Sequence, residues 1–144
     1  KANPDFHNAF NHLGMNYVAT KRFDEAIKQF EKANQLSNGS VGLIESIWAN
    51  GFAGNKEKAQ QLLTQLPKDG KISPFDLAVI YTSLDEKEKA IEYLEEAYQK
   101  RDPQLVPIKV YPPFSSLRNE TKFIGLLKKM NLFLANSAAS NTLG

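Results

Sequence analysis

The chain has 144 residues, of which 42% are hydrophobic and 24% are charged, and it carries 18 Lys and Arg residues against 16 Asp and Glu residues. This near balance, without a long basic run, argues against direct nucleic-acid binding. The absence of Cys excludes disulfides, thiolate metal sites and cysteine nucleophiles, and the apolar runs are too short for a membrane helix. We therefore expect a globular cytoplasmic protein without a membrane anchor or cofactor. Because its first residue is Lys1, we expect it to be a fragment or a processed product.

Apolar residues recur at three- and four-residue steps along most of the chain, which predicts amphipathic helices joined by short turns. Gly54 and the Pro67–Gly70 region mark two of the breaks, and Ser73 with Pro74 forms a helix start. In chain order, the expected helices are 6–20, 24–36, 41–53, 56–66, one that begins at Pro74, and 86–100.

The C-terminal third is less regular. Residues 104–111 form a short apolar segment that Pro107 interrupts, and Pro112-Pro113 forces a break before a single expected turn at 114–117. A final helix is predicted from Thr121 to Leu134. We expect the small, polar tail 135–144 to be loosely held or to add a helical turn.

The helix pairs repeat one another when they are aligned on Ala26, Ala59 and Ala90, at spacings of 33 and 31 residues. The aligned positions on either side of these alanines are Tyr17, Asn50 and Tyr81, then Phe30, Leu63 and Leu94, then Ala33, Leu66 and Ala97. Small residues at Gly14 and Ala78 would let the second helix of a pair approach the first, and large ones would fill the space between pairs.

This pattern resembles the tetratricopeptide repeat family. The first unit carries Phe10-x-x-Leu13-Gly14-x-x-Tyr17, then Ala26-x-x-x-Phe30 and Ala33; the third carries Leu77-Ala78-x-x-Tyr81, then Ala90-x-x-x-Leu94 and Ala97. The second unit departs from the pattern at Ser46-Ile47, Asn50 and Leu66. The resemblance implies an all-α fold, an α-solenoid of about three helix pairs with a C-terminal capping helix. The expected boundaries are 3–103 for the repeats (about 3–38, 41–67 and 73–101), 104–134 for the capping segment and 135–144 for the tail.

The C-terminal segment is similar to the ending of bacterial multidomain proteins with such repeats. The residues that carry this similarity are Asp102-Pro103-x-Leu105, Ile108-Lys109, Pro113-Phe114, Leu117-Arg118, Phe123 and Leu126-Leu127-x-x-Met130-x-Leu132. In those relatives the repeats follow a winged-helix, cyclase or kinase-like domain. The similarity implies a C-terminal sensor or interaction module of a larger protein.

The family binds partners in a concave groove lined by the first helix of each pair. The residues that helical spacing places on this face are Asn8, Asn11, His12, Met15, Ile44, Glu45, Trp48, Phe52, Phe75, Asp76 and Val79. Trp48 and Phe52 lie one turn apart, and they are either interface anchors or core residues that pack against the C-terminal segment.

One subclass of the family grips a terminal carboxylate with basic residues on this face. Here the corresponding positions carry Asn11, Met15, Glu45, Ile72 and Asp76, so that a carboxylate clamp is not expected. A mixed apolar and acidic groove instead favours an amphipathic or basic partner segment.

Catalytic and metal motifs are missing from the sequence. His7 and His12 are five residues apart, and so they do not share a helix face as a metal pair would. The carboxylates between Asp85 and Glu96 read as a solvated face. We therefore predict a non-enzymatic module that binds a protein or peptide partner. The alternative is a C-terminal sensor or self-association module, forming a homo-oligomer, of a bacterial transcriptional regulator or signalling enzyme.

Overall fold

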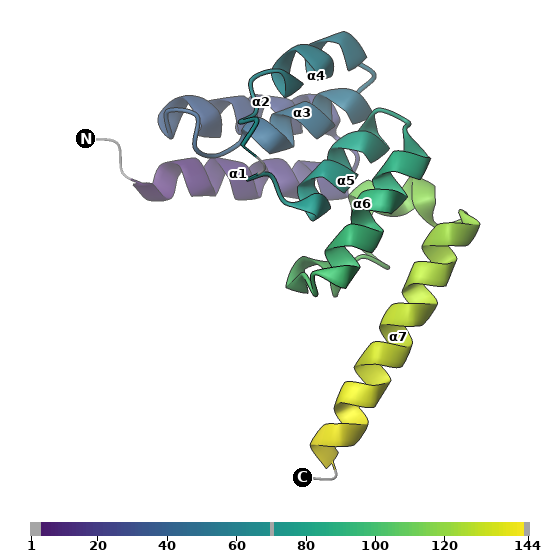
Figure 1. Cartoon of the computed structure of the whole chain (residues 1–144). Helices are drawn as coiled ribbons and strands as arrows, with labels where there is room; N and C mark the ends of the chain where they lie inside the picture. The colour runs from purple at the N-terminus through teal and green to yellow at the C-terminus, as the bar shows by residue number, and fades with distance from the viewer. Residues whose placement is uncertain (1–3, 70, 143–144) are drawn as a thin grey trace.

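The computed structural model describes the backbone of residues 4–69 and 71–142, and the side chains of residues 6–69 and 71–131. This part of the chain is helical, as predicted. Its elements are α1 (Pro4–Ala19), α2 (Phe23–Leu36), α3 (Leu43–Phe52), α4 (Lys56–Leu63), α5 (Pro74–Ser83), α6 (Lys87–Gln99), the 3-10 helices η1 (Pro103–Leu105) and η2 (Pro112–Leu117), and α7 (Thr121–Thr142). Helices α1–α2, α3–α4 and α5–α6 form successive pairs, and α7 begins beside α6 (Figure 1). The fold is an α-solenoid with a C-terminal helix, which confirms the predicted fold class.

The turn inside each pair is built in the same way. Lys21, Gly54 and Asp85 occupy equivalent positions and all have a left-handed backbone, with φ of 59°, 89° and 62°. A left-handed residue directly after a helix ends it and redirects the chain. The three pairs therefore share one turn geometry, although their turn residues differ.

The first pair is held closely by a glycine. A Cβ added at Gly14 would lie 2.4 Å from Cε1 of Phe30, so that the phenyl ring occupies the space that a side chain would need. In the third pair the equivalent residues are Ala78 and Leu94, both fully buried. The larger side chain, Phe30, thus packs against glycine, and the smaller Leu94 packs against alanine. Both combinations of residues give a close-packed interior.

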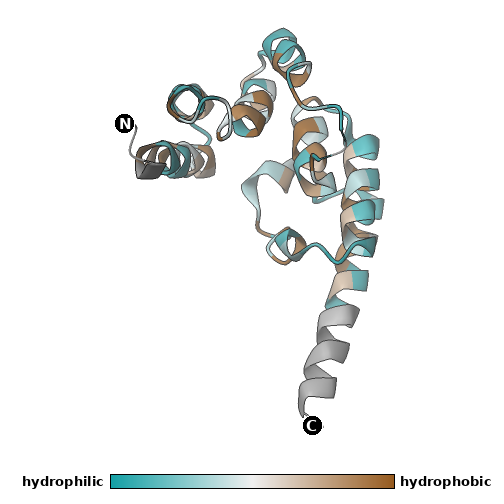
Figure 2. Cartoon of the chain, turned by 60° about the vertical axis from the view of Figure 1, so that its left-hand side comes forward, coloured by the Kyte–Doolittle hydropathy of each residue, from teal (hydrophilic) through white to brown (hydrophobic). Residues whose placement is uncertain are grey.

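The second pair stacks on both of its neighbours through its first helix, α3. Helix α3 contacts α2 on one side and α5 on the other. A Cβ at Gly51 would lie 2.3 Å from Oγ of Ser83, so the ends of α3 and α5 come together more closely than any larger residue would allow. Apolar residues line the facing sides of the helices and hydrophilic residues the outer sides (Figure 2).

Some helix ends differ from the predicted ones. Helix α4 ends at Leu63 rather than at residue 66, because Gln65 and Leu66 donate their N–H groups to carbonyls three residues back, at Leu62 and Leu63. These bonds tighten the chain into a 3-10 turn before Pro67. The turn predicted at 114–117 is a longer 3-10 helix that starts at Pro112, a residue without an N–H to satisfy.

Helix α7 closes the C-terminal side of the stack. Phe123, Leu126 and Met130 are buried against the rest of the molecule, and Lys87 of α6 is paired with Glu120 just before α7, with 3.4 Å between Nζ and Oε1. The helix continues to Thr142, past the end predicted at Leu134. The side chains of the predicted tail 135–144 lie outside the described residues. Within the described part of the chain, no helix has the length and apolar character that crossing a membrane requires.

Candidate functional site

The residues predicted to bind a partner are repeats of the same positions. In the register of the helix pairs, Asn11, Ile44 and Phe75 are equivalent, as are His12, Glu45 and Asp76, and Met15, Trp48 and Val79. We call the side of α1, α3 and α5 that carries these residues the first-helix face.

Burial increases along the first-helix face from α1 to α5. Met15 is half-buried, whereas its equivalents Trp48 and Val79 are 3% and 1% exposed. Asn11 and Ile44 are half-buried, and Phe75 is 5% exposed. The face is therefore open at α1 and closed at α5.

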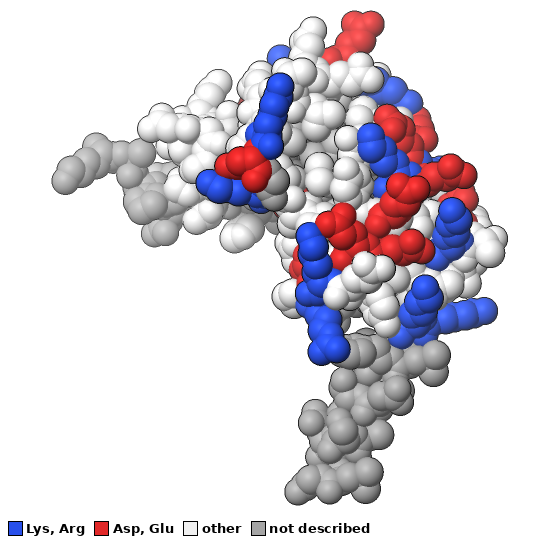
Figure 3. All heavy atoms as spheres, in the orientation of Figure 1, with Lys and Arg blue, Asp and Glu red and all other residues white. Residues whose placement is uncertain are grey.

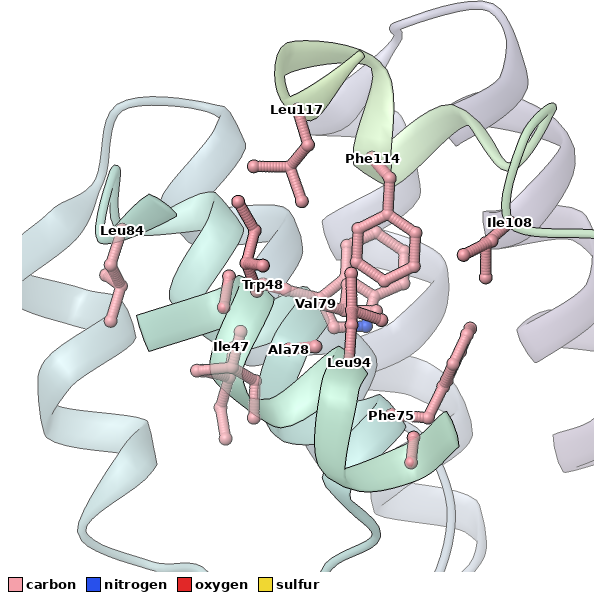
Figure 4. Packing of buried hydrophobic residues seen from close by; sticks show 14 of the residues in the cluster. Ile47, Trp48, Phe75, Ala78, Val79, Leu84, Leu94, Ile108, Phe114 and Leu117 are labelled. Carbon is pink, nitrogen blue, oxygen red and sulfur yellow. The ribbon is translucent and has the colours of Figure 1, made fainter. Parts of the chain in front are cut away.

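The cover over α5 is the chain's own η2 segment. The Phe75 ring meets Tyr111 and Phe114, each with a centroid separation of 5.5 Å, and the Phe114 ring stands nearly perpendicular to it, at 86°. Phe114 and Leu117 point from η2 into the core that also holds Trp48 and Val79 (Figure 4). Segment η2 also contacts α1. It thus lies where the family resemblance places a bound partner.

Trp48 and Phe52 are expected from the sequence to be either interface anchors or core residues, and the two side chains lie in different environments. Trp48 belongs to the core, with its ring edge-on to Phe30 at 5.5 Å. Phe52 is half-buried and stacks on Phe23 at 5.5 Å, with an angle of 25° between the rings. Phe52 therefore lies at the boundary between α2 and α3.

The polar residues of the first-helix face remain accessible or partly so. Asn8 and His12 are exposed on α1, whereas Glu45 is half-buried and its Oε1 accepts a hydrogen bond from Nδ2 of Asn11 at 3.3 Å. Asp76 is half-buried at the start of α5, where its N–H donates to Oγ of Ser73 at 3.1 Å and its carboxylate accepts from the same hydroxyl at 2.9 Å. The Ser73 hydroxyl thus caps the start of α5, and the Asp76 carboxylate bonds back to that hydroxyl rather than to the backbone N–H that a full capping box would use.

Carboxyl groups lie near one another and near Tyr111 where α5 and η2 meet. Burial raises the pKa of the Asp76 carboxyl, the nearby charge of Asp102 raises it further, and the hydrogen bond from Ser73 opposes both effects. Burial, followed by the charges of Asp76 and Glu45, raises the pKa of the Tyr111 hydroxyl to about 12. Both shifts thus follow chiefly from burial of the titrating group itself, and nearby carboxylates add to them.

The carboxylates of the α6 region differ from those of the first-helix face because lysines accompany them. Lys100 pairs with Glu96 at 2.8 Å, and Lys56 pairs with Asp85. Acidic and basic side chains are interleaved on this side of the molecule (Figure 3). Among the described residues, no three His, Asp or Glu side chains are grouped so as to hold a metal ion. This surface reads as a solvated outer face.

A pocket that the sequence did not indicate lies where α6 and η1 approach α7. It has a volume of about 460 Å³ and is lined by Tyr98, Gln99, Arg101, Asp102, Pro103, Leu105, Val106 and Met130. No single periodic segment supplies this lining, which explains why helical spacing could not find it. The pocket includes none of the residues predicted for the first-helix face.

Comparison with protein families supports the repeat assignment. The family model described as Tetratricopeptide repeat matches residues 7–39 and 75–99. These ranges cover most of α1–α2 and α5–α6, the two pairs whose sequences follow the repeat pattern more closely. Comparisons with curated proteins and with solved structures gave no significant match.

Proposed function

We propose that this chain is a non-catalytic protein-binding module that engages a peptide or a partner domain through its first-helix face. The two matches to the tetratricopeptide repeat support a protein partner, because such repeats generally mediate interactions between proteins. The repeated helix pairs support an extended surface, because solenoid repeats build their binding surfaces from equivalent positions of successive units.

The observation that carries the proposal is the difference in burial along the first-helix face. The chain covers α5 with its own η2 segment, whereas Asn8 and His12 are exposed and Asn11, Met15 and Ile44 remain half-buried. The partner therefore contacts α1 and α3 first. The buried residues Trp48, Phe75 and Val79 support this surface from beneath, and a partner would reach them only if η2 moved aside.

The open part of the face combines apolar and polar contacts. Met15 and Ile44 supply apolar area, and the flexible Met15 side chain adapts to differently shaped partners. Asn8, Asn11, His12 and Glu45 supply hydrogen bonds and charge that select the partner's orientation, and Asp76 adds a carboxylate at the covered edge of the face. Helix α1 packs on α2, and α3 packs on α2, α4 and α5. Because both helices are held in this way, binding proceeds with little backbone rearrangement.

Peptides selected from a random display library test this proposal. Amide hydrogen exchange of the complex should show protection in α1 and α3, and Met15→Ala should weaken binding. The matched control is Gln35→Ala on the exposed side of α2, which should leave binding unchanged. Protection confined to α2, α4 and α6 would contradict the proposal.

A further inference from the structure

The first-helix face holds acidic groups without cationic partners. Among the described residues, the only side-chain donor to the Glu45 carboxylate is the neutral amide of Asn11, and the only one to Asp76 is the Ser73 hydroxyl. Neither carboxylate takes part in an ion pair within the part of the chain that has described side chains. On α6, by contrast, Glu96 is paired with Lys100, with 2.8 Å between Oε1 and Nζ.

A second, independent feature lies at the same place. The Oδ1 atom of Asn11 is buried and has no hydrogen-bond partner among the described residues, while Nδ2 of the same amide points to Glu45. A buried acceptor without a donor is unfavourable, because it has lost its hydrogen bonds to water. The junction of α1 and α3 therefore has an excess of acceptors, which a donor supplied by another molecule would satisfy.

Acidic groups from different helix pairs lie near one another. Tyr111 lies on the η2 side of the face. Its pKa is raised by burial and, to a smaller extent, by the charges of Asp76 and Glu45. Burial raises the pKa of Asp76, and the charge of Asp102 raises it further. Glu45 and Asp76 therefore both lie near Tyr111, and Asp102 lies near Asp76.

We infer that the open part of the first-helix face binds a basic partner segment, with a Lys or Arg side chain received between Asn11 and Glu45. This inference rests on the proposed function and specifies the partner's chemistry. The aliphatic stem of a Lys or Arg side chain packs on apolar surface while its charged end reaches a carboxylate. Met15 and Ile44 provide that surface beside Glu45. An acidic segment would meet uncompensated carboxylates and would be repelled.

Two fluorescent peptide libraries with identical apolar positions test the inference. The charged positions are Arg in one library and Glu in the other, and binding is measured by anisotropy at low and at high salt. We expect the Arg library to bind, and binding to weaken at high salt. The variant Glu45→Gln should weaken it by about threefold to tenfold, the loss of one charge-assisted contact at a partly exposed site.

The control variant is Glu92→Gln, which removes an exposed carboxylate on α6 and should leave binding unchanged. Thermal unfolding of each variant shows whether the fold is retained. If the Glu library binds as tightly, or if Glu45→Gln has no effect on a bound Arg peptide, the inference is wrong while the proposed function stands. If neither library binds, the inference is wrong, and the display selection described above decides separately whether the proposed function stands. Self-association of the chain that Glu45→Gln abolishes would assign the face to a second copy and overturn the inference.

Discussion

The first and third helix pairs follow the same packing pattern, but the first-helix face is partly exposed in the first pair and covered in the third. In α5 the face carries Phe75 and Val79, and the chain covers them with Tyr111, Phe114 and Leu117. In α1 the equivalent positions carry Asn11 and Met15 and remain partly open. One repeat architecture can thus assign the same position to the core in one copy and to a partner in another. The four predictions below test this difference.

The largest effect is expected from uncovering α5. Phe114 is fully buried, so Phe114→Ala should lower the free energy of unfolding by about 3–5 kcal/mol. The variant Val110→Ala, at a residue that is 70% exposed just before η2, should change it little. Urea denaturation measures both. Equal effects of the two variants would show that η2 does not hold the third pair.

A second prediction concerns the two ways of packing a pair. The variant Gly14→Ala pushes a Cβ against the Phe30 ring, and we expect it to cost about 1–2 kcal/mol despite the higher helix propensity of Ala. Adding Phe30→Leu reproduces the combination found at Ala78 and Leu94. The double variant should therefore be more stable than the sum of the single variants predicts, with a coupling of about 1 kcal/mol.

Gly125 in α7 provides the control for this experiment, because a Cβ there would meet nothing within 4 Å. Gly125→Ala should stabilise the protein by up to about 1 kcal/mol. Additive effects of Gly14→Ala and Phe30→Leu in the denaturation series would contradict the packing relationship.

A smaller effect is expected at the turns. Lys21 adopts the left-handed backbone that Gly54 adopts in the second pair. Because that conformation strains a residue with a Cβ, Lys21→Gly should raise the free energy of unfolding by up to about 1 kcal/mol. The matched change Lys28→Gly, at an exposed position inside α2, should lower it by about 1 kcal/mol. A loss of stability in Lys21→Gly would mean that Lys21 makes a contact that outweighs its strain.

The smallest effect depends on pH. The pKa of Asp76 is raised above its ordinary value of 3.8, chiefly by burial. The folded state therefore binds the proton more tightly than the unfolded state, and stability falls as pH rises from below 3.8 through the folded pKa. Asp76→Asn should raise the melting temperature at neutral pH, and the gain should shrink in acid. Exposed Asp69→Asn is the control, and a gain independent of pH would refute this account.

Much of the fold could be predicted from the sequence because it depends on local periodicity. The spacing from Gly14 through Tyr17 and Ala26 to Phe30 reports packing within one pair, and the third pair repeats this spacing. The structure has all of these helices, and its differences lie at helix ends such as that of α4. Residues that pack within a unit therefore carry most of the recognisable signal.

The cover over α5 could not be predicted in the same way. Residues 104–117 have no helical period, and their place is set by contacts with α5 and α1, which lie far away in the sequence. A signal was nonetheless present in the candidate residues themselves. Phe75 and Val79 are apolar where Asn11 is polar, and a face that changes from polar to apolar along a stack is typical of one that becomes covered.

The contact of η2 with α1 has a consequence for how the molecule unfolds. In an ordinary solenoid each unit touches only its neighbours, and the ends can fray while the middle stays folded. Here a segment that follows the third pair also touches the first pair, which links the two ends of the stack. Opening α1 would therefore disturb η2, and with it the interior of α5. We therefore expect the chain to unfold in one cooperative step, and not by separate unfolding of its terminal helix pairs.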